Sequence, residues 1–166
     1  LTLDNVKRDE KLITNVMGDD FKILLKGDNS LKSIIVWGDG YGGNLTITGD
    51  GKLTLNSEKT ENTAITIQAE YTEGKVKIEK NVQMEMYAKE GYPIIEIVGA
   101  NNSDKDKAVV IDGKLTQNYE VEQHITEVTN NVYVVAKDST ARCYFTKFEK
   151  NGKYYGGRSK FDDNFK

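Results

Sequence analysis

Cysteine and histidine are almost missing from this chain, and each scarcity excludes a class of chemistry. Cys143 is the only cysteine and His124 the only histidine among 166 residues. A disulfide framework and a cysteine-based metal site are therefore excluded. A single histidine also leaves a histidine-based catalytic triad without support. We expect Cys143 to be an ordinary strand residue, because no histidine or helix start lies near it to activate the thiol.

The chain also lacks concentrated charge and long apolar runs. Its 23 Lys and Arg residues and 26 Asp and Glu residues are spread along the sequence and give a net charge of −3. Nucleic acid is therefore not an expected partner, because phosphate binding needs a concentrated basic surface. No apolar run approaches the ~20 residues of a membrane-spanning helix, so no transmembrane segment is expected.

Short strand patterns are abundant instead. Leu45-Thr46-Ile47, Leu53-Thr54-Leu55 and Ile65-Thr66-Ile67 each place threonine between two aliphatic residues, and each is followed by a polar corner. Strict alternation of this kind predicts β-strands with one buried face. The fifteen glycines and the single proline fit short strands joined by tight turns.

The apolar pairs recur at a nearly constant spacing. We arrange them in two columns in which successive pairs lie 19 to 23 residues apart, for example Ile34, Leu53, Val76 and Ile95. A β-sandwich does not require one period, whereas a coil that wraps once per period does. The pattern predicts an all-β parallel β-helix with a period of about 20 residues. Its central expectation is one buried column with Thr46 and Thr66 exposed, formed by Ile23, Leu45, Ile65 and Met84.

The pattern changes toward the end of the chain. The period fails after Val98, and "NNSDKDK" is expected to be an irregular loop or insertion. Longer alternating strands begin at Tyr119, and Asn151-Gly152 is a strong hairpin signal. We therefore divide the chain into parallel β-helix coils at 1–118 and a C-terminal antiparallel hairpin or small-sheet cap with a tail at 119–166.

Residues 1–98 resemble a known family. "LTLDNV", "ILLKGDNSL" and "NLTITGDGKLTLNS" follow one another as they do in bacterial carbohydrate-binding domains with a pectate-lyase-like right-handed parallel β-helix. The resemblance implies a right-handed coil and an extracellular or cell-surface location. It also implies binding of plant polysaccharides, particularly acidic ones, and an association with calcium. Residues 119–166 match no part of this pattern.

One set of acidic residues is a candidate calcium site. Asp28, Asp50 and Glu70 each lie three residues past an apolar pair of the first column. If the register holds, they form a vertical file in which like charges repel and a hard divalent cation relieves the repulsion. The alternative is that such residues occupy corners because they form turns.

Aromatic residues near predicted corners are the candidate ligand-binding set. Trp37 and Tyr41 lie in the glycine-rich segment "WGDGYGG", and Tyr71 and Tyr92 lie 21 residues apart. Flat rings beside polar groups suit a pyranose, which has an apolar face and polar edges. The alternative is that these rings cover the ends of the core.

Three functions remain open on these grounds. The first is non-catalytic binding of a polysaccharide by a secreted or surface-displayed bacterial protein, with calcium assisting at an acidic polymer. The second is a structural or adhesive segment without a sugar site. The third is a polysaccharide lyase on the same fold, with Lys22, Lys52 or Lys77 as the base.

Overall fold

The computed structural model describes residues 1–16, 20–38, 43–69, 73–99, 104–125, 130–137, 148–150 and 153–155. Within these ranges the chain forms strands and one short helix. In chain order they are β1 (Thr2–Asp4), β2 (Lys11–Val16), β3 (Asp20–Lys26), β4 (Asp28–Leu31), β5 (Ser33–Gly38), β6 (Asn44–Gly49), β7 (Lys52–Leu55), β8 (Ile65–Ala69), β9 (Lys75–Ile78), β10 (Gln83–Met86), β11 (Ile95–Gly99), α1 (Lys105–Ala108), β12 (Val109–Ile111), β13 (Lys114–Leu115), β14 (Tyr119–Ile125), β15 (Asn130–Ala136), β16 (Phe148–Lys150) and β17 (Lys153–Tyr155).

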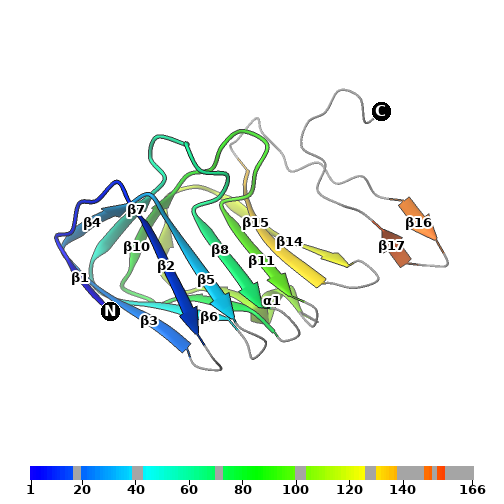
Figure 1. The fold of residues 1–166 in the computed structure, drawn as a ribbon, viewed down its shortest axis with the longest axis horizontal. Helices are drawn as coiled ribbons and strands as arrows, with labels where there is room; N and C mark the ends of the chain where they lie inside the picture. Colours follow the sequence, from blue (N-terminus) through cyan, green and yellow to red (C-terminus); the bar gives the residue numbers. More distant parts are fainter. Residues whose placement is uncertain are drawn as a thin grey trace.

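Three sheets enclose the core, and the expectation of an all-β fold with parallel sheets is confirmed. Sheet A has the strand order β1-β3-β6-β9-β12, and sheet B has the order β13-β10-β7-β4. Sheet C has the order β14-β15-β11-β8-β5-β2 and forms the broad face in Figure 1. Every pairing within sheets A and B is parallel, and so is sheet C from β2 to β11.

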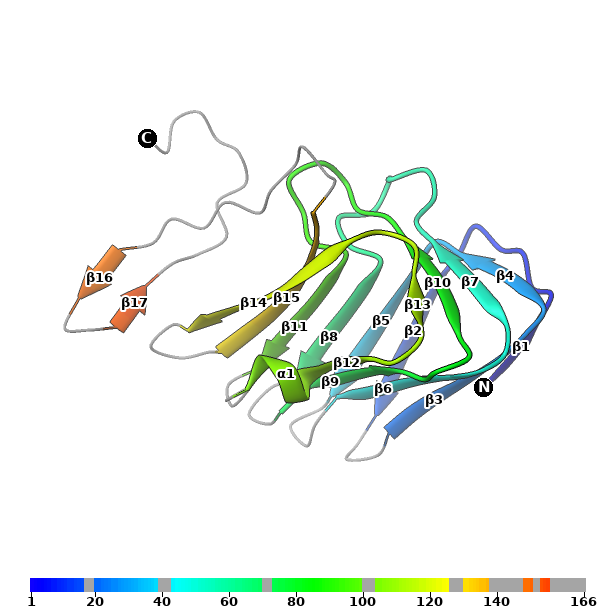
Figure 2. The same ribbon diagram turned by 180° about the vertical axis from the view of Figure 1, so that it is seen from behind.

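From β3 onward the chain visits the sheets in a fixed order. It passes from sheet A to sheet B to sheet C, and β6, β9 and β12 each start the next circuit. Figure 2 shows the successive circuits side by side, with β3, β6 and β9 along one side and β4, β7 and β10 along another. Each strand from β6 to β13 therefore pairs with the strand from the previous circuit, not with its neighbour in the sequence.

The predicted columns and their period are wrong. Ile65 stands opposite Ile34 and Ile95 in sheet C, whereas Leu45 stands opposite Phe21 and Val76 in sheet A. Met84 is in sheet B, so the residues expected to form one column occupy three sheets. Thr46 and Thr66 do face outward, but they are half-buried and lie in different sheets.

Unequal corners explain the error. The register step is 24 residues from Asn29 to Leu53 but 31 residues from Leu53 to Met84. The first circuit joins sheet B to sheet C through Lys32 alone, whereas the later circuits use the loops 56–64 and 87–94. With these loops included, Val109 stands opposite Val76. The period seemed to end after Val98 only because the predicted spacing between circuits was wrong.

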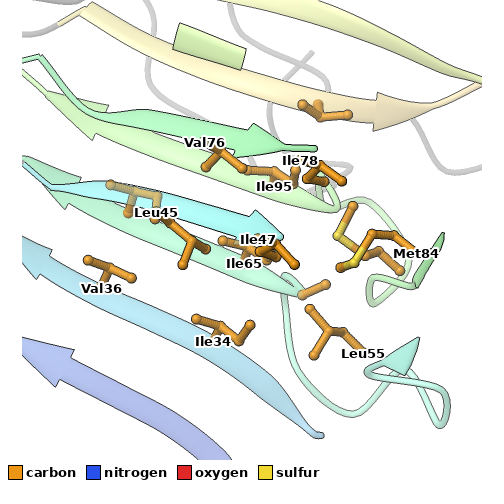
Figure 3. Close-up of a cluster of buried hydrophobic side chains, with 14 of the residues drawn as sticks. Ile34, Val36, Leu45, Ile47, Leu55, Ile65, Val76, Ile78, Met84 and Ile95 are labelled. Atoms are coloured by element: carbon orange, nitrogen blue, oxygen red, sulfur yellow. The ribbon is translucent and has the colours of Figure 1, made fainter. Parts of the chain in front are cut away.

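Aliphatic side chains from all three sheets fill the interior. Ile47 of sheet A, Met84 of sheet B and Ile65 of sheet C are fully buried, and Figure 3 shows these side chains pointing toward one another between the strands. Because inward and outward residues alternate along each strand, the outward residues make three separate surfaces. These surfaces are where a ligand can bind.

Antiparallel pairing begins at Tyr119. Strand β14 turns back into β15, and β15 lies antiparallel between β14 and β11. The hairpin predicted around Asn151-Gly152 is confirmed by the antiparallel pairing of β16 with β17, although the two turn residues lie outside the described residues. The segment expected to be irregular overlaps α1, whose N-cap Asp104 accepts a hydrogen bond from the backbone N–H of Asp106 at 2.9 Å. Cys143 lies outside the described residues.

Candidate functional site

The outward surface of sheet C differs from the outward surfaces of the other two sheets. On sheet A, Lys22 and Lys77 lie on either side of Thr46. On sheet B, the Lys52 Nζ lies 3.2 Å from the Glu85 Oε2. Charged groups therefore occupy both of these surfaces and keep them hydrated. The parallel strands of sheet C instead present mostly apolar, hydroxyl and amide side chains with the carboxylate of Glu96. We call this surface the C face, formed by Ile13, Asn15, Ile35, Trp37, Thr66, Gln68, Glu96 and Val98.

Trp37 is the central aromatic residue of the C face. It follows the buried Val36 in β5, so the strand alternation turns its ring outward, and 44% of its surface is exposed. In register with it are Asn15 of β2 and Gln68 of β8, one on each side. The row continues to Val98 of β11. A flat ring is thus placed between two amide groups that can donate and accept hydrogen bonds.

A second row runs beside the first, two residues earlier along each strand. Ile13 of β2 stands opposite Ile35 of β5, and Ile35 stands opposite Thr66 of β8. Ile13 is 59% exposed, which is unusual for an isoleucine within a strand. Glu96 of β11 supplies a carboxylate, and beyond it the register continues to Tyr133 of β15 and Glu122 of β14. Together the two rows make a strip in which apolar side chains lie beside amide, hydroxyl and carboxylate groups.

The structure does not bring the predicted aromatic residues into one site. Trp37 lies near the end of β5, whereas Tyr92 is half-buried in the loop before β11, at the opposite end of the sheet C strands. Tyr41 and Tyr71 lie outside the described residues. Trp37 is therefore the only member of the predicted set that the structure places on the C face, among the residues it describes.

The predicted acidic file is not formed by its two described members. Asp28 stands opposite Lys52, while Asp50 precedes Lys52 by two residues in the turn between β6 and β7. Asp28 already has a cation, because the Lys7 Nζ lies 2.8 Å from its Oδ2. This hydrogen bond to Lys7 lowers the pKa of Asp28, and the Lys52 charge adds to the effect. Glu70 lies outside the described residues.

Within the described ranges, no group of three or more His, Cys, Asp or Glu side chains is arranged to hold a metal ion. The side chain of the one histidine, His124, is not among those described, although its backbone pairs with Asn131. Of the candidate lysine bases, Lys22 and Lys77 are exposed on sheet A and Lys52 is paired with Glu85. A lyase base is normally desolvated beside its substrate, and these positions do not provide that surrounding.

Sequence interpretation missed Ile13, Ile35 and Gln68. The signal was present for the two isoleucines, because each alternates with residues that the structure buries or half-buries, Leu12 in β2 and Ile34 in β5. Ile13 and Ile35 are adjacent across β2 and β5, and contiguous outward apolar residues indicate a contact surface. Gln68 carries no such signal, and only the parallel register shows that it stands beside Trp37.

The chain was compared with protein-family models, curated proteins and solved structures, and nothing in any of the three matches it. The likeness to carbohydrate-binding domains thus stays a prediction from short sequence phrases. Across the part of the chain that the structure describes, no helix combines the length and apolar character needed to cross a membrane.

Proposed function

We propose that the protein binds a polysaccharide on the C face without cleaving it. The exposed ring of Trp37 between Asn15 and Gln68 is the observation that carries the proposal. An indole ring covers the apolar face of a pyranose, and the flanking amides reach its hydroxyl groups. The sequence resemblance supports a bacterial protein that acts outside the cell or on its surface.

A flat strip on parallel strands suits a polymer better than a small molecule. Neighbouring strands are about 4.8 Å apart, so the strip offers contact groups at regular intervals to successive sugar units. Each contact is weak, since an open surface removes little water from the ligand. We expect a dissociation constant near micromolar or weaker.

Replacing Trp37 by Ala is expected to weaken binding roughly tenfold or more, because burying a large apolar side chain stabilises a contact by about 1.5–3 kcal/mol. The measurement is affinity electrophoresis or calorimetry on plant polysaccharides. Tyr92→Ala is the matched control, since that ring lies at the other end of the strands and should leave the affinity unchanged. Equal losses in the two variants would count against the C face.

The same binding measurement tests whether calcium takes part in polysaccharide binding. If calcium bridges the protein to an acidic polymer, a chelator should release the polymer, and Asp50→Asn should reproduce the effect in the presence of calcium. Binding that a chelator leaves unchanged would remove calcium from the proposal. Release of unsaturated uronate by the wild-type protein would show a lyase instead.

A structural or adhesive role is the second candidate, and the exposed Ile13 favours it. Ile13 stands opposite Ile35 in the row next to that of Trp37, and such an aliphatic surface also suits contact with another protein. This role predicts that no polymer retains the wild-type protein.

We also infer that the three-sheet circuit is a right-handed parallel β-helix. The fixed order of sheets A, B and C and the parallel pairing of successive circuits support this. Parallel strand connections are right-handed in nearly all proteins because of the natural twist of strands. A crystal structure with the opposite hand would overturn the inference.

A further inference from the structure

The unequal corners between sheets B and C leave a hollow on the surface. Lys32 alone joins β4 to β5, whereas the loop 56–64 joins β7 to β8 and projects beyond the shorter corner. The loop is visible in Figure 1 as the teal segment between β7 and β8. The hollow between the two corners has a volume of about 330 Å³. Cavities that hold small organic molecules start at about this size.

The hollow is lined with groups that form hydrogen bonds. Ser30 and Arg8 line it from the first circuit, and Ser57 and Thr60 line it from the loop. Ser57 and Thr60 are exposed, so their hydroxyl groups face water. Within the described part of the chain, no side-chain partner is found for these two hydroxyls or for the Arg8 guanidinium. Both kinds of group are therefore free to bond a ligand, with hydroxyls that donate and accept and a guanidinium that donates.

Two of the cations that line the hollow, Lys7 and Lys32, are paired with carboxylates. The Lys7 Nζ lies 2.8 Å from the Asp28 Oδ2, and the Lys32 Nζ lies 3.8 Å from the Glu61 Oε1. Lys11 also pairs with Glu61, at 2.9 Å.

Two further carboxylates, Asp9 and Glu58, line the hollow itself beside Arg8. An anionic sugar would meet these carboxylates and would have to compete with existing ion pairs. A neutral sugar meets acceptors and donors at the same time, which suits neighbouring hydroxyl groups.

We propose that this hollow is a subsite for one uncharged sugar unit, so that the ligand of the C face is a neutral polysaccharide. This inference rests on the proposed function, because it assigns a second contact to the same polymer. Lys32 lines the hollow and directly precedes β5, and Trp37 lies five residues further along. At about 3.3 Å per residue the two contacts are roughly 16 Å apart along the strand direction, a distance that a short oligosaccharide spans.

The test measures the affinity of the protein for β-glucan and galactomannan, which are uncharged, and for polygalacturonate, at low and high salt. We expect retention on an uncharged polymer that salt does not change, since screening acts only between charges. Arg8→Met and Thr60→Val should each weaken that binding about three- to tenfold, through loss of one hydrogen-bonding group. Lys22→Met removes a cation and Thr46→Val a hydroxyl group on sheet A, and neither control should have an effect.

Two outcomes overturn the subsite and leave the proposed function standing. In one, polygalacturonate binds most tightly, high salt releases it, and Trp37→Ala still weakens it. In the other, an uncharged polymer binds through Trp37 while Arg8→Met and Thr60→Val behave like their controls. Failure of every polymer to retain the wild-type protein overturns both proposals.

Discussion

Replacing Ile65 by Ala is expected to destabilise the protein by roughly 2–5 kcal/mol. Ile65 is fully buried, and its register partners Ile34 and Ile95 are buried on either side of it in sheet C. The three strands are held together by parallel ladders of backbone hydrogen bonds, so the surrounding side chains cannot close the cavity that the truncation leaves. The cost therefore includes the lost apolar transfer and the cavity itself.

Ile13 offers a control with the same chemical change. It lies in the same sheet but points outward and is 59% exposed, so Ile13→Ala should cost less than about 1 kcal/mol. The measurement is denaturant unfolding followed by far-ultraviolet circular dichroism. If Ile65→Ala does not fold, Ile65→Val is the second variant, with an expected cost of about 0.5–1.5 kcal/mol. Equal costs at the two positions would contradict the burial that the structure gives them.

Strand positions were predictable because alternation is a local property. The phrases around Leu45, Leu53 and Ile65 each became a strand with its aliphatic residues inward. The hairpin of β16 and β17 was equally local, since the Asn-Gly dipeptide between them is a strong sequence signal for a tight hairpin turn. Parallel sheets also followed from the recurrence of these phrases, although the recurrence was assigned the wrong length.

Register was not predictable, because it depends on corner lengths that alternation does not show. The step from one circuit to the next changes where loop 56–64 replaces the single residue Lys32. In the sequence, polar residues that join two circuits look the same as polar residues that join two sheets within one circuit. The error propagated to the site: Asp28 and Asp50 were placed in one file, and Gln68 was not recognised as the neighbour of Trp37.

One residue of the interrupting loop shows how the longer corner is held in place. Asn56 is almost fully buried and follows β7 directly. Its Nδ2 donates to the backbone carbonyl of Glu61 at 2.8 Å and to that of Tyr87 at 3.1 Å, and its Oδ1 accepts from the Glu61 N–H at 3.0 Å. The side chain thus closes its own loop and joins it to the loop of the next circuit.

Asn56→Ala is therefore expected to cost roughly 2–5 kcal/mol, because each buried backbone group left without a partner costs about 1–3 kcal/mol. Part of the loss has a different origin, since Asn56 has a φ of 56°, where asparagine is tolerated better than alanine. Asn56→Gly removes the same hydrogen bonds without that backbone strain, so it should be less destabilising than Asn56→Ala by about 1 kcal/mol.

Asn62→Ala, at an exposed position of the same loop, is the control and should change the unfolding free energy by less than about 0.5 kcal/mol. Denaturant unfolding of the wild-type protein and the three variants separates the cost of the lost hydrogen bonds from the cost of backbone strain. An Asn56→Ala variant as stable as Asn62→Ala would mean that the loop does not depend on this side chain. The hollow beside it would then have no fixed wall, and the subsite would lose the rigidity that binding a sugar requires.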